Sequence, residues 1–300
     1  RISLYITPFI TMNKVIIWAH KLHTSTHSYV QNGYYRAFKK LGWETHWVDT
    51  TDVDSVDVSN SVIFVEDSVK AGMPIRKDCK YITHHLPTQE LVDQGIPYEN
   101  IIKLGNYLPQ EEIHEKVADL TYWDESTRSI YQCWGTDLLP DEIDTDDYVE
   151  FVPTRKKVNY VAMLYEQGPW WAQEFANIMN EKHQVQFDVY TQNASDEENR
   201  NLIRSSFLCP DFRSDWHLQC GYIPCRMFKN ISYGRITGTN SPLVKRALGD
   251  HIVFGGTPHT LYENLLNAEV NRTVDMKAAM TYVKENHTFI NRVNNLLKFL

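Results

Sequence analysis

The chain has 300 residues, a net charge of −8 and 42% hydrophobic residues. This length and apolar content are enough for one large globular domain or for two α/β domains of about 150 residues each. The acidic balance argues against nucleic acid as the main partner, because binding to phosphate backbones requires a basic face.

The first half of the chain predicts a parallel sheet with crossover connections. Residues 1–11 precede Met12 and lack a small-residue cleavage site, so they are interpreted as an extension or an expression remnant. Apolar runs predict strands at 14–19, 43–48, 61–65, 81–84 and 101–104. Helical spacing at 29–41 follows a polar loop at 20–26, where a dinucleotide-binding fold would have glycines.

An acidic stretch at 141–150 is most simply a solvated linker or domain edge. A second α/β series follows it, with strands expected at 158–163, 185–190, 206–209, 222–225 and 251–254. Helices are expected at 170–182, 197–205, 215–220, 260–266 and from about 276 to the C-terminus. The chain therefore predicts an α/β protein of two facing Rossmann-like domains, at 12–152 and 153–300, with a cleft between them.

The segment at 221–241 is the most informative part of the chain. A short apolar run leads into a polar stretch with three cations, Arg226, Lys229 and Arg235, which then enters a helix near Ser241. A strand end, a cationic loop and a helix start, in that order, are how open α/β folds hold phosphorylated ligands. We expect Arg226 and Lys229 to bind a diphosphate. The further candidate binding residues are Asn230, Ser232, Tyr233, Gly234, Arg235, Thr239, Asn240 and Ser241.

Other sequence patterns limit the cellular location of the protein and the reactions that it could catalyse. No apolar run approaches the roughly 18 residues of a membrane-spanning helix, so no transmembrane segment is predicted. The five cysteines lack metal-ligand spacing and predict reduced, mostly buried thiols, and a sequon at Asn230 would put a glycan on the cationic segment. These features predict a cytoplasmic protein. There is no Walker motif, GxSxG, HExxH or GxGxxG after a strand.

Three segments resemble the metal-independent glycosyltransferases of the glycosyltransferase-B fold. They are the His-containing loop after the first strand, the run at 211–224 ending in Gly-Tyr-Ile-Pro, and Leu-Tyr-Glu-Asn at 261–264 before a long final helix. The second is similar to the exostosin pattern, although it lacks the acidic residue usual before Gly-x-Ile-Pro. Glu263 is the replacement candidate for a ribose contact. The chain also resembles exostosin-like enzymes of large DNA viruses, some of which are similar to xylosyltransferases.

The resemblance implies an acceptor-side first domain, a nucleotide-sugar-binding second domain and a C-terminal helix that packs back on the first. It implies a UDP-sugar donor as cosubstrate, with UDP-xylose the best guess, a glycan hydroxyl as acceptor, and no separate cofactor. Fixed cations are the expected device for stabilising the leaving diphosphate, since Asp52-Val-Asp54 lies in a loop remote from other metal-ligand cues. No metal site is predicted.

An acceptor hydroxyl needs a base, and imidazole suits that task. His27 is the first candidate and His23 the second, with His20 in the same loop. His84, His85 and Asp124 are rivals, and the segment 134–137 is a candidate for the acceptor side or for a turn before the linker. A base candidate and the absence of Glu-x7-Glu favour inversion. Two alternatives remain open: a sugar-nucleotide epimerase or phosphorylase, and a non-catalytic protein that binds glycans or nucleotides.

Overall fold

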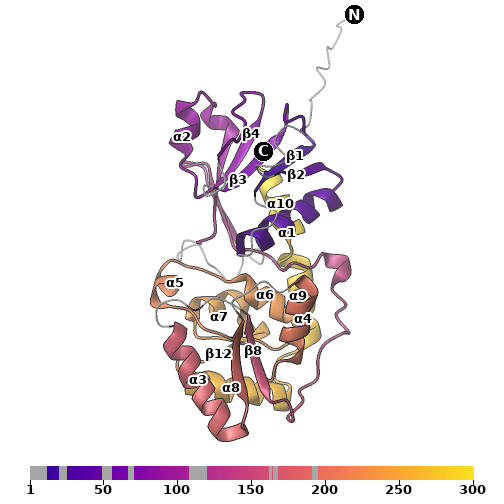
Figure 1. Cartoon of the computed structure of the whole chain (residues 1–300), viewed down its shortest axis with the longest axis vertical. Coiled ribbons are helices and arrows are strands. Elements are labelled where there is room, and N and C mark those ends of the chain that lie inside the picture. Colours follow the sequence, from indigo (N-terminus) through magenta and orange to yellow (C-terminus); the bar gives the residue numbers. More distant parts are fainter. Residues whose placement is uncertain are drawn as a thin grey trace, which may run out of the picture.

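The computed structural model describes residues 12–19, 26–48, 56–66, 71–107, 120–161, 164, 168–190 and 195–300, without the side chains of 26–28. Two α/β units follow one another along the chain and lie one above the other in Figure 1. This architecture confirms the predicted fold class of two Rossmann-like domains. The boundary after residue 152 and the nature of residues 1–11 stay predictions.

The first unit is built on one sheet. Its strands are β1 Lys14–Trp18, β2 Glu44–Val48, β3 Val62–Glu66, β4 Lys80–His84, β5 Ile101–Gly105, β6 Thr121–Asp124 and β7 Ser129–Gln132. They lie in the order β2-β1-β3-β4-β5-β7-β6, all parallel except that β6 runs antiparallel to β7. The strand order reverses between β1 and β3. In open α/β sheets, ligands bind beyond the carboxyl ends of the strands at such a switch point.

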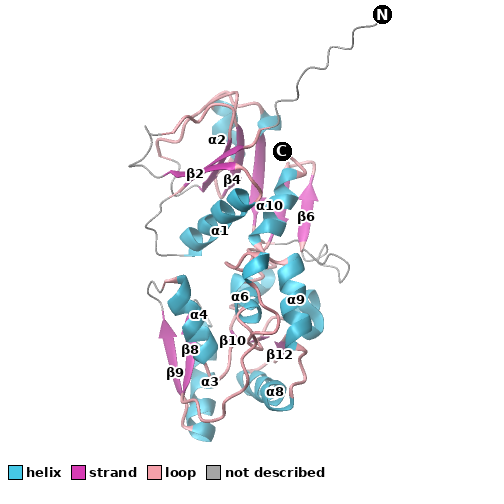
Figure 2. Cartoon of the chain, turned by 90° about the vertical axis from the view of Figure 1, so that its right-hand side faces the viewer, coloured by secondary structure: helices cyan, strands magenta, loops and turns pink. Residues whose placement is uncertain are grey.

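The helices of this unit cover the sheet, and one of them comes from the far end of the chain. Helix α1 (Thr26–Lys40) buries Val30, Tyr34, Ala37 and Phe38 at helical spacing, and α2 is Thr88–Asp93. Helix α10 (Phe289–Leu297) packs on α1, and the Phe289 ring lies 5.0 Å from that of Tyr34. Figures 1 and 2 both show α10 beside α1. The predicted return of the C-terminal helix to the first domain is therefore confirmed.

The second unit contains shorter parallel strands and more helices. Its strands are β8 Lys157–Val161, β9 Gln186–Tyr190, β10 Pro210–Asp211, β11 Gly238–Thr239 and β12 Val253–Phe254. Its helices are α3 Gly168–His183, α4 Asp196–Ser205, α5 Asp215–Gln219, α6 Cys225–Ser232, α7 Pro242–Leu248, α8 Pro258–Asn271 and α9 Met276–Asn286. The strands form two small parallel sheets, β8-β9 and β10-β11-β12. The Phe207 amide donates to the Lys157 carbonyl at 2.7 Å, so the chain leading into β10 lies beside the start of β8.

The segment 222–232 differs from the predicted strand and polar loop. Among these residues only Tyr222 pairs with another strand segment, through a single antiparallel bridge to Tyr107, and the cationic stretch forms α6. Pro224 precedes the helix, and Met227, Phe228 and Ile231 are buried at positions i, i+1 and i+4. This apolar helical face packs into the core, so burial rather than ligand contact determines the local structure.

Helix α6 ends at a glycine with a left-handed backbone. Gly234 has φ +76°, its amide donates to the Ile231 carbonyl, and the Arg235 amide donates to the Asn230 carbonyl, both at 2.9 Å. These two bonds form a Schellman motif, which satisfies carbonyls at the helix end. A Cβ on Gly234 would also come within 2.6 Å of the Tyr148 Cα. Gly234 is therefore required by the turn and by the linker packed against it.

The chain crosses between the two units twice, and the two crossings lie against each other. Thr136 pairs with Thr288 in a parallel bridge, and the Thr136 amide donates to the His287 carbonyl at 2.9 Å. A Cβ on Gly135 would lie 2.8 Å from the Thr288 carbonyl carbon. The Tyr29 hydroxyl donates to the Gly135 carbonyl at 2.7 Å. The segment 134–137, a candidate for the acceptor side, is therefore part of this double crossing.

The single long C-terminal helix expected from about 276 is in fact two helices. Helix α9 ends at Asn286, His287 is its C-cap, and α10 begins at Phe289. The break lies where the chain crosses to the first unit, and Arg292 is buried beneath it. The Arg292 guanidinium donates to the carbonyls of Cys133 (2.6 Å) and Asn286 (3.1 Å). These bonds fix both crossings to α10, and they satisfy two backbone carbonyls beside the break between α9 and α10.

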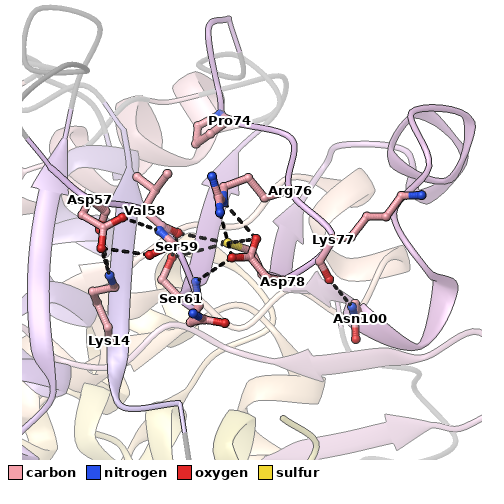
Figure 3. A network of polar contacts seen from close by, with 12 residues as sticks. Lys14, Asp57, Val58, Ser59, Ser61, Pro74, Arg76, Lys77, Asp78 and Asn100 are labelled. Carbon is pink, nitrogen blue, oxygen red and sulfur yellow. Dashed lines mark hydrogen bonds and ion pairs between the residues drawn. The ribbon is translucent and has the colours of Figure 1, made fainter. Parts of the chain in front are cut away.

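A polar network joins the loops at the amino-terminal edge of the first sheet (Figure 3). Lys14 forms an ion pair with Asp57 at 3.2 Å, and Arg76 forms one with Asp78 at 2.8 Å. Hydrogen bonds from Ser59 and Lys14 hold the pKa of the Asp57 carboxyl at about 2. Lys14 begins β1, and the other residues precede β3 or β4. All of them lie at the edge opposite the switch-point ends, so we interpret the network as support for the loops.

Candidate functional site

The carboxyl ends of three strands in the second unit meet around one buried carboxylate. Asp211, at the end of β10, is fully buried and accepts a 2.5 Å bond from the Arg213 guanidinium. The Arg226 Nε lies 3.5 Å from the same carboxylate oxygen, and its Nη2 donates to the Val161 carbonyl at the end of β8. Two guanidinium groups thus share one carboxylate, which leaves one positive charge in excess at this edge.

The loops that follow β10 and β11 are locked to each other by an amide. The Arg213 backbone N–H donates to Asn240 Oδ1 at 2.7 Å, and Asn240 Nδ2 donates back to the Arg213 carbonyl at 2.9 Å. Ser241 is the N-cap of α7, and the Thr239 hydroxyl donates to Asp211 at 3.4 Å. This reciprocal bonding positions the Arg213 backbone before any ligand arrives, which is the preorganisation that anion binding benefits from.

The two arginines differ in their surroundings. Burial alone would lower the pKa of the Arg213 guanidinium, but the neighbouring Asp211 carboxylate outweighs it and raises that pKa above its ordinary value. The Arg226 guanidinium lies 3.9 Å from the Tyr160 ring centroid, a cation–π contact. Neither Arg213 Nε nor Arg226 Nε has a hydrogen-bond partner among the described residues. A planar, fixed cation pair of this kind matches the oxygens of a phosphate.

The predicted binding residues therefore divide into two groups. The structure brings Arg226, Thr239, Asn240 and Ser241 together at the strand ends. Lys229 lies one helical turn along α6 from Arg226, with its Nζ 4.2 Å from the ring centroid of Tyr29. Its ammonium therefore faces Tyr29 of the first unit, and its predicted diphosphate contact stays a prediction.

The second group forms hydrogen bonds within the fold, and its predicted diphosphate contacts stay predictions. The Asn230 amide donates to Thr237 Oγ1 at 3.0 Å, and Ser232 Oγ lies 2.7 Å from Thr136 Oγ1. The Tyr233 hydroxyl donates to the Asp137 carboxylate at 2.6 Å. Ser232 and Tyr233 thus join the end of α6 to the crossing between the units, and Asn230 joins α6 to the residue before β11. Gly234 ends α6, as described above.

Arg235 was predicted from sequence as a ligand cation, but it is completely buried. Its guanidinium forms an ion pair with Glu269 at 2.9 Å and donates to the backbone carbonyls of Arg204, Ser206 and Phe207. All of these partners lie within the fold. Arg235 is therefore a core cation that ties α8 to the end of α4.

Glu263 lies on the exposed side of α8. Its carboxylate is 3.0 Å from His259 Nε2 one helical turn earlier, and both side chains are about half exposed. No contact places Glu263 with Arg213 or Arg226, so its ribose role stays a prediction. Arg213 and Asp211 were missed as site residues, although they belong to the polar stretch that directly follows an expected strand. Polar residues just after a strand were the signal that could have indicated them.

The candidate bases are only partly described. His23 and His20 lie outside the described residues, as does the pair Asp52 and Asp54, and His27 is in the first turn of α1 with its side chain outside them. The role of His27 or His23 as base stays a prediction. His84 ends β4 and is buried, with Nδ1 3.0 Å from the Leu104 carbonyl, and His85 follows with an exposed ring and φ +60°.

Asp124 is not placed to act as a base. It ends β6, and its carboxylate accepts hydrogen bonds from Ser126 (2.6 Å) and Thr127 (2.7 Å) within the turn to β7. These bonds lower the pKa of the Asp124 carboxyl. Asp124 is therefore a turn residue. Within the described part of the chain, no group of three or more His, Cys, Asp or Glu side chains has the geometry of a metal site.

His287, at the crossing, gives the structure a defined acid sensitivity. It is completely buried, stacks on Phe228 at 4.3 Å, and its Nδ1 lies 2.9 Å from the Arg292 guanidinium. Burial and then the Arg292 charge lower the pKa of the imidazole well below its ordinary value. His287 is therefore neutral, with Nδ1 as the acceptor. A group with a depressed native pKa contributes stability above its unfolded pKa, and this contribution is lost as the pH falls.

We expect the unfolding free energy to decrease from about pH 6.5 downward by about 1.4 kcal/mol per pH unit from this residue. His287→Asn keeps an acceptor for Arg292 but removes the titration. The substitution should cost about 1–3 kcal/mol at pH 7.5, and the two stability curves should converge as the pH falls. Urea unfolding at several pH values, with His259→Asn as a surface control, measures this. Parallel curves would assign the acid sensitivity to other groups.

Two further properties concern the chain as a whole. Three of the five cysteines, Cys79, Cys133 and Cys209, are buried, in agreement with the predicted burial, and their reduced state stays a prediction. Within the described residues, no helix combines the length and apolar character needed to cross a bilayer.

No protein-family model matches the chain, and no curated protein sequence matches it either. Solved structures do share its fold. A glycosyltransferase involved in avilamycin A biosynthesis, AviGT4, is 10% identical with a TM-score of 0.52, covering 95% of this chain and 96% of its own. A glycosyltransferase from Rickettsia africae ESF-5 is 11% identical with a TM-score of 0.51, covering 96% and 98%. At these identities the likeness shows the fold alone: two facing Rossmann-like units, the glycosyltransferase-B arrangement, over nearly the whole chain.

Proposed function

We propose that this chain is a glycosyltransferase that moves a sugar from a nucleoside diphosphate onto a hydroxyl of a glycan. The observation that carries the proposal is the arginine pair Arg213 and Arg226 around Asp211 at the carboxyl ends of β8 and β10. Ligands of open α/β sheets bind at this edge, and the net positive charge suits a diphosphate. The two solved structures named above are both described as glycosyltransferases.

In the proposed reaction, the bond between the anomeric carbon and the β-phosphate oxygen breaks, and the acceptor oxygen forms a new bond to that carbon. The developing charge on the diphosphate is stabilised by the guanidinium groups, which are fixed by Asp211, Tyr160 and the Val161 carbonyl. Such preorganised cations need no rearrangement as the charge develops. The acceptor proton passes to a base of the first unit, for which His27 and His23 are the proposed residues.

The finer assignments belong to the same proposal. UDP is the proposed nucleotide and xylose the proposed sugar, following the resemblance to exostosin-like enzymes. Transfer without a metal ion is also proposed, because fixed cations can stabilise the leaving diphosphate. Inversion is proposed because the sequence contains candidate bases for the acceptor hydroxyl. Cytoplasmic location stays a prediction.

The experiment is a donor and acceptor screen with the purified chain. UDP-xylose, UDP-glucose, UDP-galactose and GDP-fucose are each incubated with a panel of aryl glycosides, with EDTA and separately with Mn²⁺. Nucleotide release and product mass are then measured. A product heavier than the acceptor by one sugar, formed with EDTA present, supports the proposal. Consumption of the donor without acceptor supports the epimerase or phosphorylase alternative. No turnover, with nucleotide binding retained, supports a binding protein.

A further inference from the structure

An aromatic cluster lies where the two units meet, beside the arginine pair. Tyr107 follows the carboxyl end of β5 in the first unit, and Trp216 lies on α5 in the second. Their rings are in edge-to-face contact, with centroids 5.2 Å apart and an interplanar angle of 82°. His217 and Tyr222 complete the cluster, with centroids 5.0 Å apart. Residues from both units thus form one aromatic cluster.

The indole of Trp216 is the accessible part of this cluster. Trp216 is 46% exposed, which is unusual for a side chain of that size. Its neighbours hold it in place: Tyr107 contacts it from the first unit, and the His217 ring lies 5.1 Å from it. His217 is oriented by a 2.8 Å hydrogen bond between its Nδ1 and Ser214 Oγ, and Ser214 is the N-cap of α5. The exposed indole is therefore supported rather than loosely placed.

The cluster is continuous with the proposed diphosphate site. The Arg213 guanidinium lies 5.8 Å from the Tyr222 ring centroid, and Tyr222 forms the antiparallel bridge with Tyr107. Burial raises the pKa of the Tyr107 phenol, so its hydroxyl remains protonated as a hydrogen-bond donor. A ring seated on Trp216 would therefore lie next to the first unit, with the cationic site on its other side.

We propose that Trp216 and Tyr107 form a subsite for a pyranose ring of the glycan acceptor, in which the sugar face stacks on the indole. This inference rests on the proposed function and names its acceptor chemistry. The axial C–H groups of a pyranose provide an apolar face that fits an aromatic ring, while its hydroxyls face solvent and the Tyr107 phenol. The position on the first-unit side of Arg213 favours the acceptor over the nucleotide base.

The test measures glycan and nucleotide affinities separately, by calorimetric titration. Wild-type protein is first screened on a glycan array, and the best-bound glycan is then titrated, as is the nucleoside diphosphate that binds most tightly. Trp216→Ala should weaken the glycan by about tenfold or more while leaving the nucleotide within about twofold. Trp216→Phe should retain part of the glycan affinity, because an aromatic face remains. Tyr98→Ala removes an aromatic that is 43% exposed just before β5, at the opposite edge, and should change neither affinity.

Three outcomes would overturn the subsite. Unchanged glycan affinity in Trp216→Ala would show that the indole does not bind the sugar. A loss of nucleotide affinity equal to or greater than that of the glycan would assign Trp216 to the base of the donor. Wild-type protein that binds no glycan would also overturn it. Glycan binding that depends on Trp216, without any sugar transfer, would instead contradict only the proposed enzymatic function.

Discussion

Arg226→Ala is expected to lower the affinity for the nucleoside diphosphate by about 10- to 150-fold. A hydrogen bond between charged groups contributes about 1.5–3 kcal/mol, and each 1.4 kcal/mol is a factor of ten in affinity. The guanidinium is held by the Val161 carbonyl at 2.8 Å and by the Tyr160 ring, so its position does not have to be acquired on binding. Arg226→Lys keeps the charge without the planar fork and should lie between wild type and Ala.

The control for this result is Arg272→Ala. Arg272 is exposed on the surface and forms an ion pair with Glu150 at 2.8 Å, so its loss changes the net charge equally without touching the strand ends. Isothermal titration with the nucleotide, supported by thermal unfolding of each variant, separates binding from folding. Equal affinities for Arg226→Ala and Arg272→Ala would remove Arg226 from the site.

Arg235→Met is expected to lower the free energy of unfolding by about 3–5 kcal/mol, because it leaves the Glu269 carboxylate buried without its partner. Burial raises the pKa of Glu269, and the Arg235 guanidinium opposes that rise. The double variant Arg235→Met, Glu269→Met should recover part of the stability. It cannot recover all of it, since the carbonyls of Ser206 and Phe207 also lose a donor.

Denaturant unfolding measures these stabilities, and titration at a temperature where each variant is folded measures nucleotide affinity. The folded Arg235 variants should bind the nucleotide as wild type does. A variant of near wild-type stability that has lost nucleotide affinity would restore Arg235 as a ligand residue.

Local patterns were sufficient for most of the fold. The apolar run at 14–19 predicts β1, and the helical spacing that follows predicts α1, because a parallel strand buried on both faces and an amphipathic helix each have their own periodicity. The β6–β7 hairpin was missed. Its residues Thr121–Asp124 and Ser129–Gln132 are short and partly polar, and their pairing depends on the sheet already formed by β5.

The error at α6 has a different cause. The prediction relied on the charges of Arg226 and Lys229. The helix is instead determined by Met227, Phe228 and Ile231, which pack into the core. The same emphasis assigned Arg235 to a ligand. Its partner Glu269 lies 34 residues further along the chain, and burial of both depends on how α4 and α8 pack. Neither fact is visible in the sequence around Arg235.

The residues of the candidate site also depend on contacts between distant parts of the chain. Arg226 was predicted from its neighbours in the sequence. Asp211 and Arg213 become site residues only because β10 pairs with β11 and the chain before it lies beside β8. A site built from the ends of several strands is a product of topology. Sequence reasoning can indicate that polar residues follow a strand, and it cannot tell which strand ends meet.

The most direct measurement of the central claim is calorimetric titration of UDP, GDP and ADP into the purified chain with EDTA present. Selective binding of one nucleoside diphosphate, with a dissociation constant of about 1 µM to 1 mM, and its loss in Arg213→Ala and Arg226→Ala, is the predicted result. Absence of binding by all three, or binding that both substitutions leave unchanged, would contradict a diphosphate site at the ends of β8 and β10.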